Sequence, residues 1–81
     1  MIKPSKFDYA ESIIRLWDQY KANKDGNANQ RHVAKESLAA IVADCDLALA
    51  DSHITDDWFK AHKAWAISGT LPYNVRLPEK P

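Results

Sequence analysis

Residues 55–69 read TDDWFKAHKAWAISG and carry the clearest start and stop signals for a helix in the sequence. Thr55 can cap the first turn with its hydroxyl, and the two aspartates after it place negative charge at the positive end of the helix dipole. Gly69 suits the left-handed residue that commonly ends a helix. These signals predict a helix over residues 56–68.

One face of this helix is aromatic when successive residues are spaced at about 100°. That face holds Trp58, Phe59, His62, Trp65 and Ala66, whereas Asp56, Lys60 and Lys63 share the other face. Aromatic side chains at helical spacing usually pack, so we predict that this face belongs to the core. His62 is then expected to lie among aromatic rings rather than to bind a metal or act as a base.

A second helix is predicted over residues 5–24, with Ser5 as its candidate cap. Its apolar side chains cover one broad arc, made of Phe7, Ala10, Ile13, Ile14, Leu16, Trp17 and Tyr20. Its polar side chains cover the opposite arc, made of Asp8, Glu11, Ser12, Arg15, Asp18 and Gln19. This separation is typical of a helix with one buried side.

The glycine and asparagines of residues 24–29 predict a turn, after which a third helix is expected over residues 30–50 with Asn27 or Asn29 as its cap. The main apolar face of this helix is Ala34, Leu38, Ile41, Val42, Cys45, Ala48 and Leu49. A thinner second stripe consists of Val33, Ala40 and Leu47. A domain with only two other helices has little to cover this stripe, so we expect it to meet the C-terminal tail or another chain.

Residues 70–81 contain three prolines, which exclude a helix. Four apolar side chains alternate with other residues here, as in an extended segment with one buried side: Leu71, Tyr73, Val75 and Leu77. The prediction is therefore an all-α fold: one small three-helix domain over residues 1–81, with an extended proline-containing C-terminal arm. We expect its core to form around Trp17, Ile41, Trp58 and Trp65.

The 81 residues carry eleven basic and eleven acidic side chains, so the net charge is zero. Residues 36–57 contain six of the acids and no Lys or Arg, and the segments on both sides are basic. The acids are Glu36, Asp44, Asp46, Asp51, Asp56 and Asp57. Two interpretations remain open: the acids are neutralised within the fold, or they form an acidic surface for a basic partner.

Metal and catalytic signals are weak, so we predict no metal, no cofactor and no enzymatic activity. Asp25, Asn27, Asn29 and Glu36 have the ligand spacing of a calcium-binding loop, but Gln30 stands where that loop needs glycine. No Cys-x-x-Cys or His-x-x-x-His pair indicates zinc. Cys45 lies among apolar residues, and the neighbouring acids should raise its pKa.

The N-terminus has no apolar stretch long enough for a signal peptide, and the longest apolar run, residues 38–43, is too short to span a bilayer. A single cysteine rules out an internal disulfide and favours a reducing compartment. The sequence therefore predicts a soluble, cytoplasmic protein without membrane contact.

A helix-turn-helix over residues 30–68 is disfavoured, because Asp56 and Asp57 would stand at the end that approaches DNA. The order Trp58-Phe59, His62, then residues 71–73 (Leu-Pro-Tyr) resembles that of the small theta subunit of a bacterial replicative polymerase. The spacing here is shorter and the first two helices show no match, so nothing is carried over from this resemblance.

The leading functional hypothesis is a non-enzymatic protein-binding module, a small regulator or inhibitor of a larger protein complex. It rests on apolar stripes in excess of the available core and on the acidic block. The candidate partner-binding residues are Asp44, Leu47, Asp51, Ile67, Tyr73, Val75 and Arg76. The expected partner is a protein with a basic surface, and a homodimer is a further candidate. Nucleic acid is the less favoured partner: the alternative is a nucleic-acid-associated regulator that uses the basic region 21–35.

Overall fold

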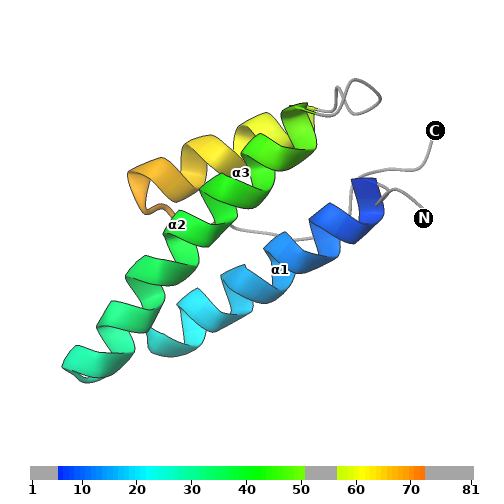
Figure 1. Cartoon of the computed structure of the whole chain (residues 1–81). Coiled ribbons are helices and arrows are strands. Elements are labelled where there is room, and N and C mark those ends of the chain that lie inside the picture. Colours follow the sequence, from blue (N-terminus) through cyan, green and yellow to red (C-terminus); the bar gives the residue numbers. More distant parts are fainter. Residues whose placement is uncertain (1–5, 51–56, 73–81) are drawn as a thin grey trace.

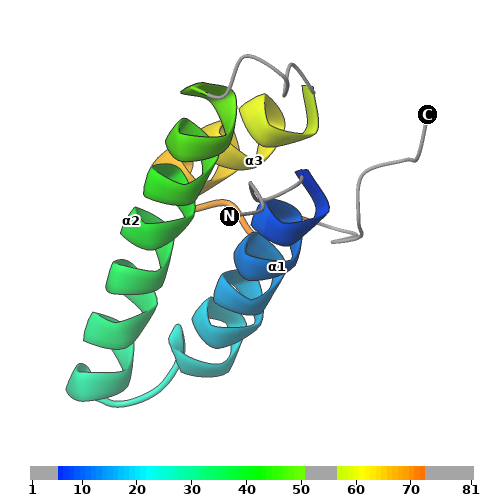
Figure 2. The same cartoon turned by 45° about the vertical axis from the view of Figure 1, so that its right-hand side comes forward.

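The computed structural model describes residues 6–50 and 57–72, and these residues form an all-α domain without strands (Figure 1). Its helices are α1 (Lys6–Asn23), α2 (Ala28–Ala50) and α3 (Asp57–Ser68). Helix α2 packs against both α1 and α3, and both views show the other two helices lying along it (Figure 2). The predicted all-α, three-helix fold is confirmed. Residues 73–81, most of the predicted arm, lie outside the described residues, as do the candidate caps Ser5 and Thr55.

Helix α1 places its apolar arc inward, as the sequence predicts. Ala10, Ile13 and Trp17 are buried, with spacings of three and four residues. All six residues of the predicted polar arc are exposed. This separation lets one side of α1 bury apolar surface against α2 while the other side stays in water.

Helix α2 begins at Ala28, two residues earlier than predicted, because Asn27 and Gln30 form a capping box. The Gln30 amide donates to Asn27 Oδ1 at 2.9 Å, and the Asn27 amide donates to Gln30 Oε1 at the same distance. Two amides at the helix start are thereby satisfied. Asn27 and Gln30, at positions three and six of the calcium-like loop, thus form the start of a helix.

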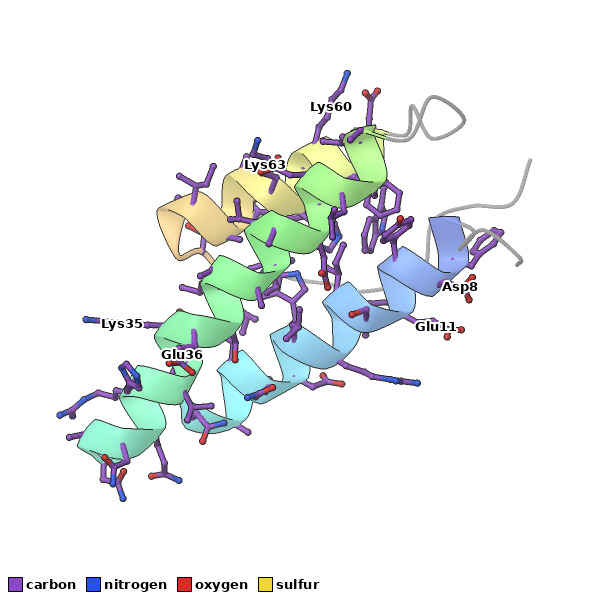
Figure 3. All side chains as sticks on the ribbon, viewed as in Figure 1. Asp8, Glu11, Lys35, Glu36, Lys60 and Lys63 are labelled. Atoms are coloured by element: carbon purple, nitrogen blue, oxygen red, sulfur yellow. The ribbon has the colours of Figure 1, made fainter. Side chains whose placement is uncertain are left out.

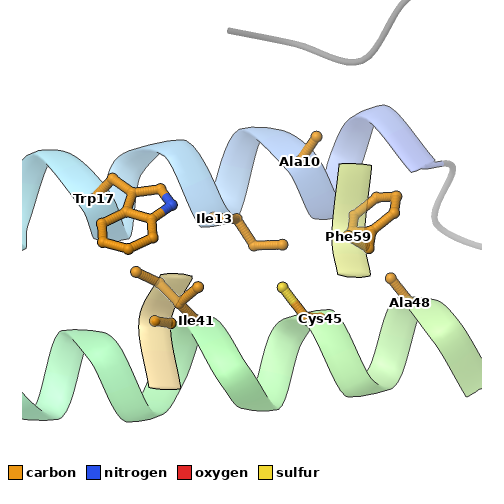
Figure 4. Close-up of a cluster of buried hydrophobic side chains, with 8 residues drawn as sticks. Ala10, Ile13, Trp17, Ile41, Cys45, Ala48 and Phe59 are labelled. Atoms are coloured by element: carbon orange, nitrogen blue, oxygen red, sulfur yellow. The ribbon is translucent and has the colours of Figure 1, made fainter. Parts of the chain in front are cut away.

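The core lies where the three helices meet (Figure 4). Its largest fully buried side chains are Trp17, Phe59, Ile13, Ile41 and Cys45. The prediction that Trp58 and Trp65 centre this core is wrong, because Trp58 is only half-buried and Trp65 is exposed. The buried stripe of α3 is instead Phe59, His62 and Ala66. The two tryptophans precede Phe59 and Ala66 by one residue, so they are turned about 100° away toward one flank.

Helix α3 ends at the left-handed glycine that the sequence predicts. Gly69 has φ of 71°, its amide donates to the Ala66 carbonyl at 3.3 Å, and the Thr70 amide donates to the Trp65 carbonyl at 2.9 Å. This pattern is a Schellman motif, which satisfies two carbonyls at the helix end. The Tyr20 hydroxyl donates to the Gly69 carbonyl at 3.2 Å and so ties α1 to this turn.

The first residues after this turn also contact the domain. Leu71 packs against the core and Pro72 is buried. The start of the predicted arm therefore lies on its own chain.

Candidate functional site

His62 lies at the centre of an aromatic cluster that joins α1 and α3. Trp17 donates its indole Nε1–H to His62 Nδ1 at 2.9 Å, across 45 residues of sequence. The Trp58 ring stacks on the imidazole with centroids 3.7 Å apart, and the Trp65 ring meets it edge-on at 4.9 Å. The sequence prediction of a histidine packed among aromatic rings is confirmed.

This environment keeps His62 neutral. The side chain is 3% exposed, and desolvation by burial lowers its pKa to about 4. Because Nδ1 accepts the indole hydrogen bond from Trp17, the ring proton lies on Nε2. The indole hydrogen bond satisfies Nδ1 of the imidazole, and the flanking rings pack against it. These contacts account for the burial of this polar side chain.

Cys45 is a free, fully buried thiol on the inner side of α2. Burial raises its pKa to about 12, and the negative charges of Asp44 and Asp46 act in the same direction. The sequence analysis predicts a raised pKa for Cys45 from the two neighbouring acids, and the structure shows that burial is the larger cause of the rise. A thiol in this state stays protonated at neutral pH and serves as a small apolar core residue.

The acidic block is largely paired within the chain. Each of its acids in the described residues has a polar neighbour, and the pairs are Glu36–His32 at 2.9 Å, Asp44–Ser12 at 2.9 Å, Asp46–Lys63 at 2.6 Å and Asp57–Lys60 at 3.9 Å. Figure 3 shows Glu36 on α2 and both lysines on α3. These pairs account for how the acids at the C-terminal half of α2 are tolerated against the helix dipole. They lie at the surface, so their carboxylates also remain accessible.

Three large apolar side chains are exposed among the described residues: Leu47 at 59%, Trp65 at 37% and Ile67 at 68%. Leu47 and Ile67 are predicted partner-binding residues, and their exposure is compatible with that role. The sequence analysis places Trp65 in the core and so does not identify it as an exposed side chain. The sequence alone does not separate Trp65 from the buried stripe of Phe59, His62 and Ala66, because Trp65 precedes Ala66 by only one residue.

Of the predicted partner-binding residues that the structure describes, Asp44 and Leu47 lie one turn apart on α2, and Ile67 lies on α3. Leu47 lies about 60° from Asp44 on α2, and Asp44 accepts its hydrogen bond from α1. Ile67 lies four residues after Lys63, on the flank of α3 that pairs with Asp46. Leu47 thus lies beside the flank of α2 that contacts α1, whereas Ile67 lies on the flank of α3 that faces α2. Asp51, Tyr73, Val75 and Arg76 lie outside the described residues.

The basic region 21–35 spans the turn between α1 and α2. Lys24 pairs with Asp25 at 3.0 Å. Arg31 and Lys35, one turn apart on α2, are exposed and line a shallow depression together with Ala28 and His32. The depression belongs to a single helix surface, and Lys35 projects from it into solvent (Figure 3).

Within the described ranges, no three His, Cys, Asp or Glu side chains come close enough to hold a metal ion. None of the helices of residues 6–50 and 57–72 is long and apolar enough to pass through a membrane. Comparison of the chain with protein-family models, with curated proteins and with solved structures finds no match.

Proposed function

We propose that this chain is a non-enzymatic protein-binding module, a small regulator or inhibitor that acts on a larger protein complex. The observation that carries the proposal is the exposure of Leu47, Trp65 and Ile67 on a chain of only 81 residues. Single exposed leucines are common, but three large apolar side chains on two adjacent helices provide anchors for a partner.

The partner that fits the surface around Leu47 is a protein with apolar and basic groups. Asp44 and Asp46 lie within one turn of Leu47. Asp46 binds Lys63 through Oδ1, and a carboxylate accepts further hydrogen bonds, so a lysine or arginine of a partner can join this pair. We place this activity in the cytoplasm, since the single cysteine of the chain is a buried free thiol that needs no oxidising compartment.

The test is affinity capture from a host lysate with matched variants of the tagged chain. Leu47→Asp and Ile67→Asp put a charge in place of each exposed apolar anchor, and Gln19→Asp adds the same charge on the exposed arc of α1. We expect a protein that the wild type and Gln19→Asp capture and that at least one of the other two variants loses. If every variant captures the same proteins as the wild type, these anchors do not bind a partner.

The alternative function, a nucleic-acid-associated regulator, is favoured by the exposure of Arg31 and Lys35 beside the depression on α2. Two to four phosphate contacts give weak binding with a shallow dependence on salt. Titration of mixed DNA and RNA at low and moderate salt tests this function directly. Binding that Arg31→Glu abolishes supports it, and the absence of binding at low salt eliminates it.

A further inference from the structure

Helix α2 has a second apolar side that faces away from the core. Glu36, Ala39, Ala43, Leu47 and Ala50 are exposed there, and Val33 and Ala40 beside them are half-buried. We call this set the outer face of α2. Glu36 and its neighbour His32 are the polar side chains here, and the other members of the set are apolar, whereas the solvent side of a helix in a small domain is usually polar.

Charged residues border this face with opposite signs at its two ends. Lys35 lies in the N-terminal half of α2, and Asp44 and Asp46 lie in the C-terminal half. Lys35 and Asp46 are eleven residues apart, which at about 100° per residue places them within about 20° of each other on the same flank. The flank of the outer face is therefore basic at one end and acidic at the other.

We propose that the outer face of α2 is a self-association surface that binds the same face of a second copy of this chain, with the two helices antiparallel. A two-fold axis makes every contact reciprocal. The midpoint of Val33 and Leu47 is Ala40, and the midpoint of Lys35 and Asp46 lies between Ala40 and Ile41. One axis beside Ala40 therefore sets Val33 opposite Leu47 of the second copy and Lys35 opposite Asp46 of the second copy.

The charges decide the direction of the second helix. Lys35 and Asp46 lie on the same flank of α2, and an antiparallel two-fold pair sets this flank against the same flank of the second helix. In a parallel two-fold pair each flank faces the opposite flank of the second helix, so Lys35 and Asp46 would not meet. The antiparallel pair therefore gains two attractions that the parallel pair lacks. At the centre, Ala39, Ala40 and Ala43 are small enough for the two backbones to approach closely.

Existing contacts of the two acids on this surface are compatible with the arrangement. Lys63 binds Oδ1 of Asp46 at 2.6 Å, which leaves Oδ2 for Lys35 of the second copy. Glu36 lies on the outer face with its carboxylate 2.9 Å from His32 Nε2, so these two side chains would enter the interface as a pair.

This inference goes beyond the proposed function, because its partner is a second copy and Ile67 takes no part in it. The first experiment uses the purified chain alone, so its result is independent of any capture from a lysate. Sedimentation equilibrium over a range of protein concentrations should show a mass that rises from 9.2 kDa toward twice that value. A mass that stays at 9.2 kDa up to millimolar concentration overturns the proposal.

Charge reversal then tests the pairing. Lys35→Glu and Asp46→Lys should each weaken self-association about tenfold or more, and an equimolar mixture of the two variants should restore it. The mixture restores it because, in each mixed pair, both acids of the first variant face the two lysines of the second variant. Arg15→Glu and Asp18→Lys make the same changes on the exposed arc of α1 and should leave self-association unchanged. Equal behaviour of all four variants overturns the assignment.

Cysteine cross-linking tests the direction. Ala40→Cys should form an intermolecular disulfide with itself, whereas Val33→Cys and Leu47→Cys should cross-link only when the two are mixed. Cys45 does not compete, because it is fully buried. Cross-linking of Val33→Cys alone would indicate parallel helices. If Ala40→Cys stays monomeric while Leu47→Asp lowers the melting temperature, another segment of the same chain covers the face, and the proposal fails.

Discussion

The two sides of α2 are both apolar, yet they have opposite environments. Ile41, Cys45 and Ala48 on the inner side are fully buried, whereas Leu47 on the outer side is 59% exposed. The difference comes from neighbours and not from α2 itself, since Trp17 of α1 and Phe59 of α3 fill the inner side. A helix with two apolar stripes therefore does not determine alone which stripe becomes the core.

Polar side chains also have different environments on the two sides of α2: they form buried hydrogen bonds on the inner side and surface charge pairs on the outer side. On the buried side Trp17 donates to His62, and the Ser37 hydroxyl donates to the Val33 carbonyl at 2.9 Å. In the described part of the chain, no buried side-chain nitrogen or oxygen lacks a hydrogen-bond partner. On the outer side, charges pair at the surface, where each pair contributes little. We therefore expect stability to depend on the inner side and to be almost insensitive to the outer side.

The largest effect should come from the tryptophan that the inner side buries. Trp17→Ala removes a fully buried indole and leaves His62 without its donor, so unfolding should become easier by about 3–5 kcal/mol. Trp65→Ala, the matched change at an exposed indole, should cost about 1–2 kcal/mol. Urea denaturation followed by circular dichroism measures both. Equal losses would show that Trp65 is as deeply packed as Trp17 and would remove the contrast.

The second effect is a dependence of stability on pH that comes from His62. Its pKa is about 4 in the folded chain and about 6.5 when unfolded, so the unfolded chain binds more protons between these values. Stability should be fully present above pH 6.5 and should fall by about 2–3 kcal/mol as the pH drops to 4. Protonation of Nδ1 would also break the hydrogen bond from Trp17.

His62→Gln is the control, because a glutamine oxygen can still accept from the indole but does not titrate near neutral pH. Between pH 6.5 and 4, the free energy of unfolding of His62→Gln should change only through the titration of the other ionisable groups of the chain. If the wild type and His62→Gln show the same pH profile, His62 is not buried as a neutral group.

Local signals in the sequence identify most of this fold. The stop at Gly69, the turn before Asn27 and the two arcs of α1 all follow from turn chemistry and helical periodicity. They are readable because each depends on residues within a few positions. The exposure of Trp65 was not predicted, since one residue of rotation decides between core and surface and tertiary packing sets that rotation.

The pairing of the acidic block was also beyond local reasoning. Asp44 meets Ser12 across 32 residues, and Asp46 meets a lysine of another helix. Composition shows that the acids are concentrated, but only the packing of the helices shows what each acid faces. The candidate site was therefore predicted in part: Leu47 and Ile67 are exposed as a binding role requires, but they lie on different flanks.

A smaller effect is expected at the turn that closes the inner side. Gly69 has φ of 71°, and the space around a Cβ at this position is empty, so only backbone strain opposes a side chain. Gly69→Ala should cost about 1 kcal/mol, and Gly69→Asn should cost less because asparagine tolerates the left-handed region better. Thermal unfolding of the two variants ranks them. A stabilised Gly69→Ala would show that the Schellman turn does not persist in solution.

The smallest effect should come from Asp46 on the outer side. Asp46→Asn breaks the ion pair with Lys63, which as a surface pair is worth about 0–1 kcal/mol. The same change removes a negative charge near the C-terminus of α2, where the helix dipole disfavours it by about 0.3–1 kcal/mol. These terms oppose each other, so the net change should stay within about 0.5 kcal/mol.

A double-mutant cycle with Lys63→Met separates the two terms. The coupling between Asp46 and Lys63 should be at most about 1 kcal/mol at low salt and should shrink in 1 M salt, because exposed charges are screened. The dipole term appears in the background of Lys63→Met, where Asp46→Asn should be slightly stabilising. A salt-insensitive coupling of several kcal/mol would mean that the pair is buried, and the outer side of α2 would then contribute to stability as the inner side does.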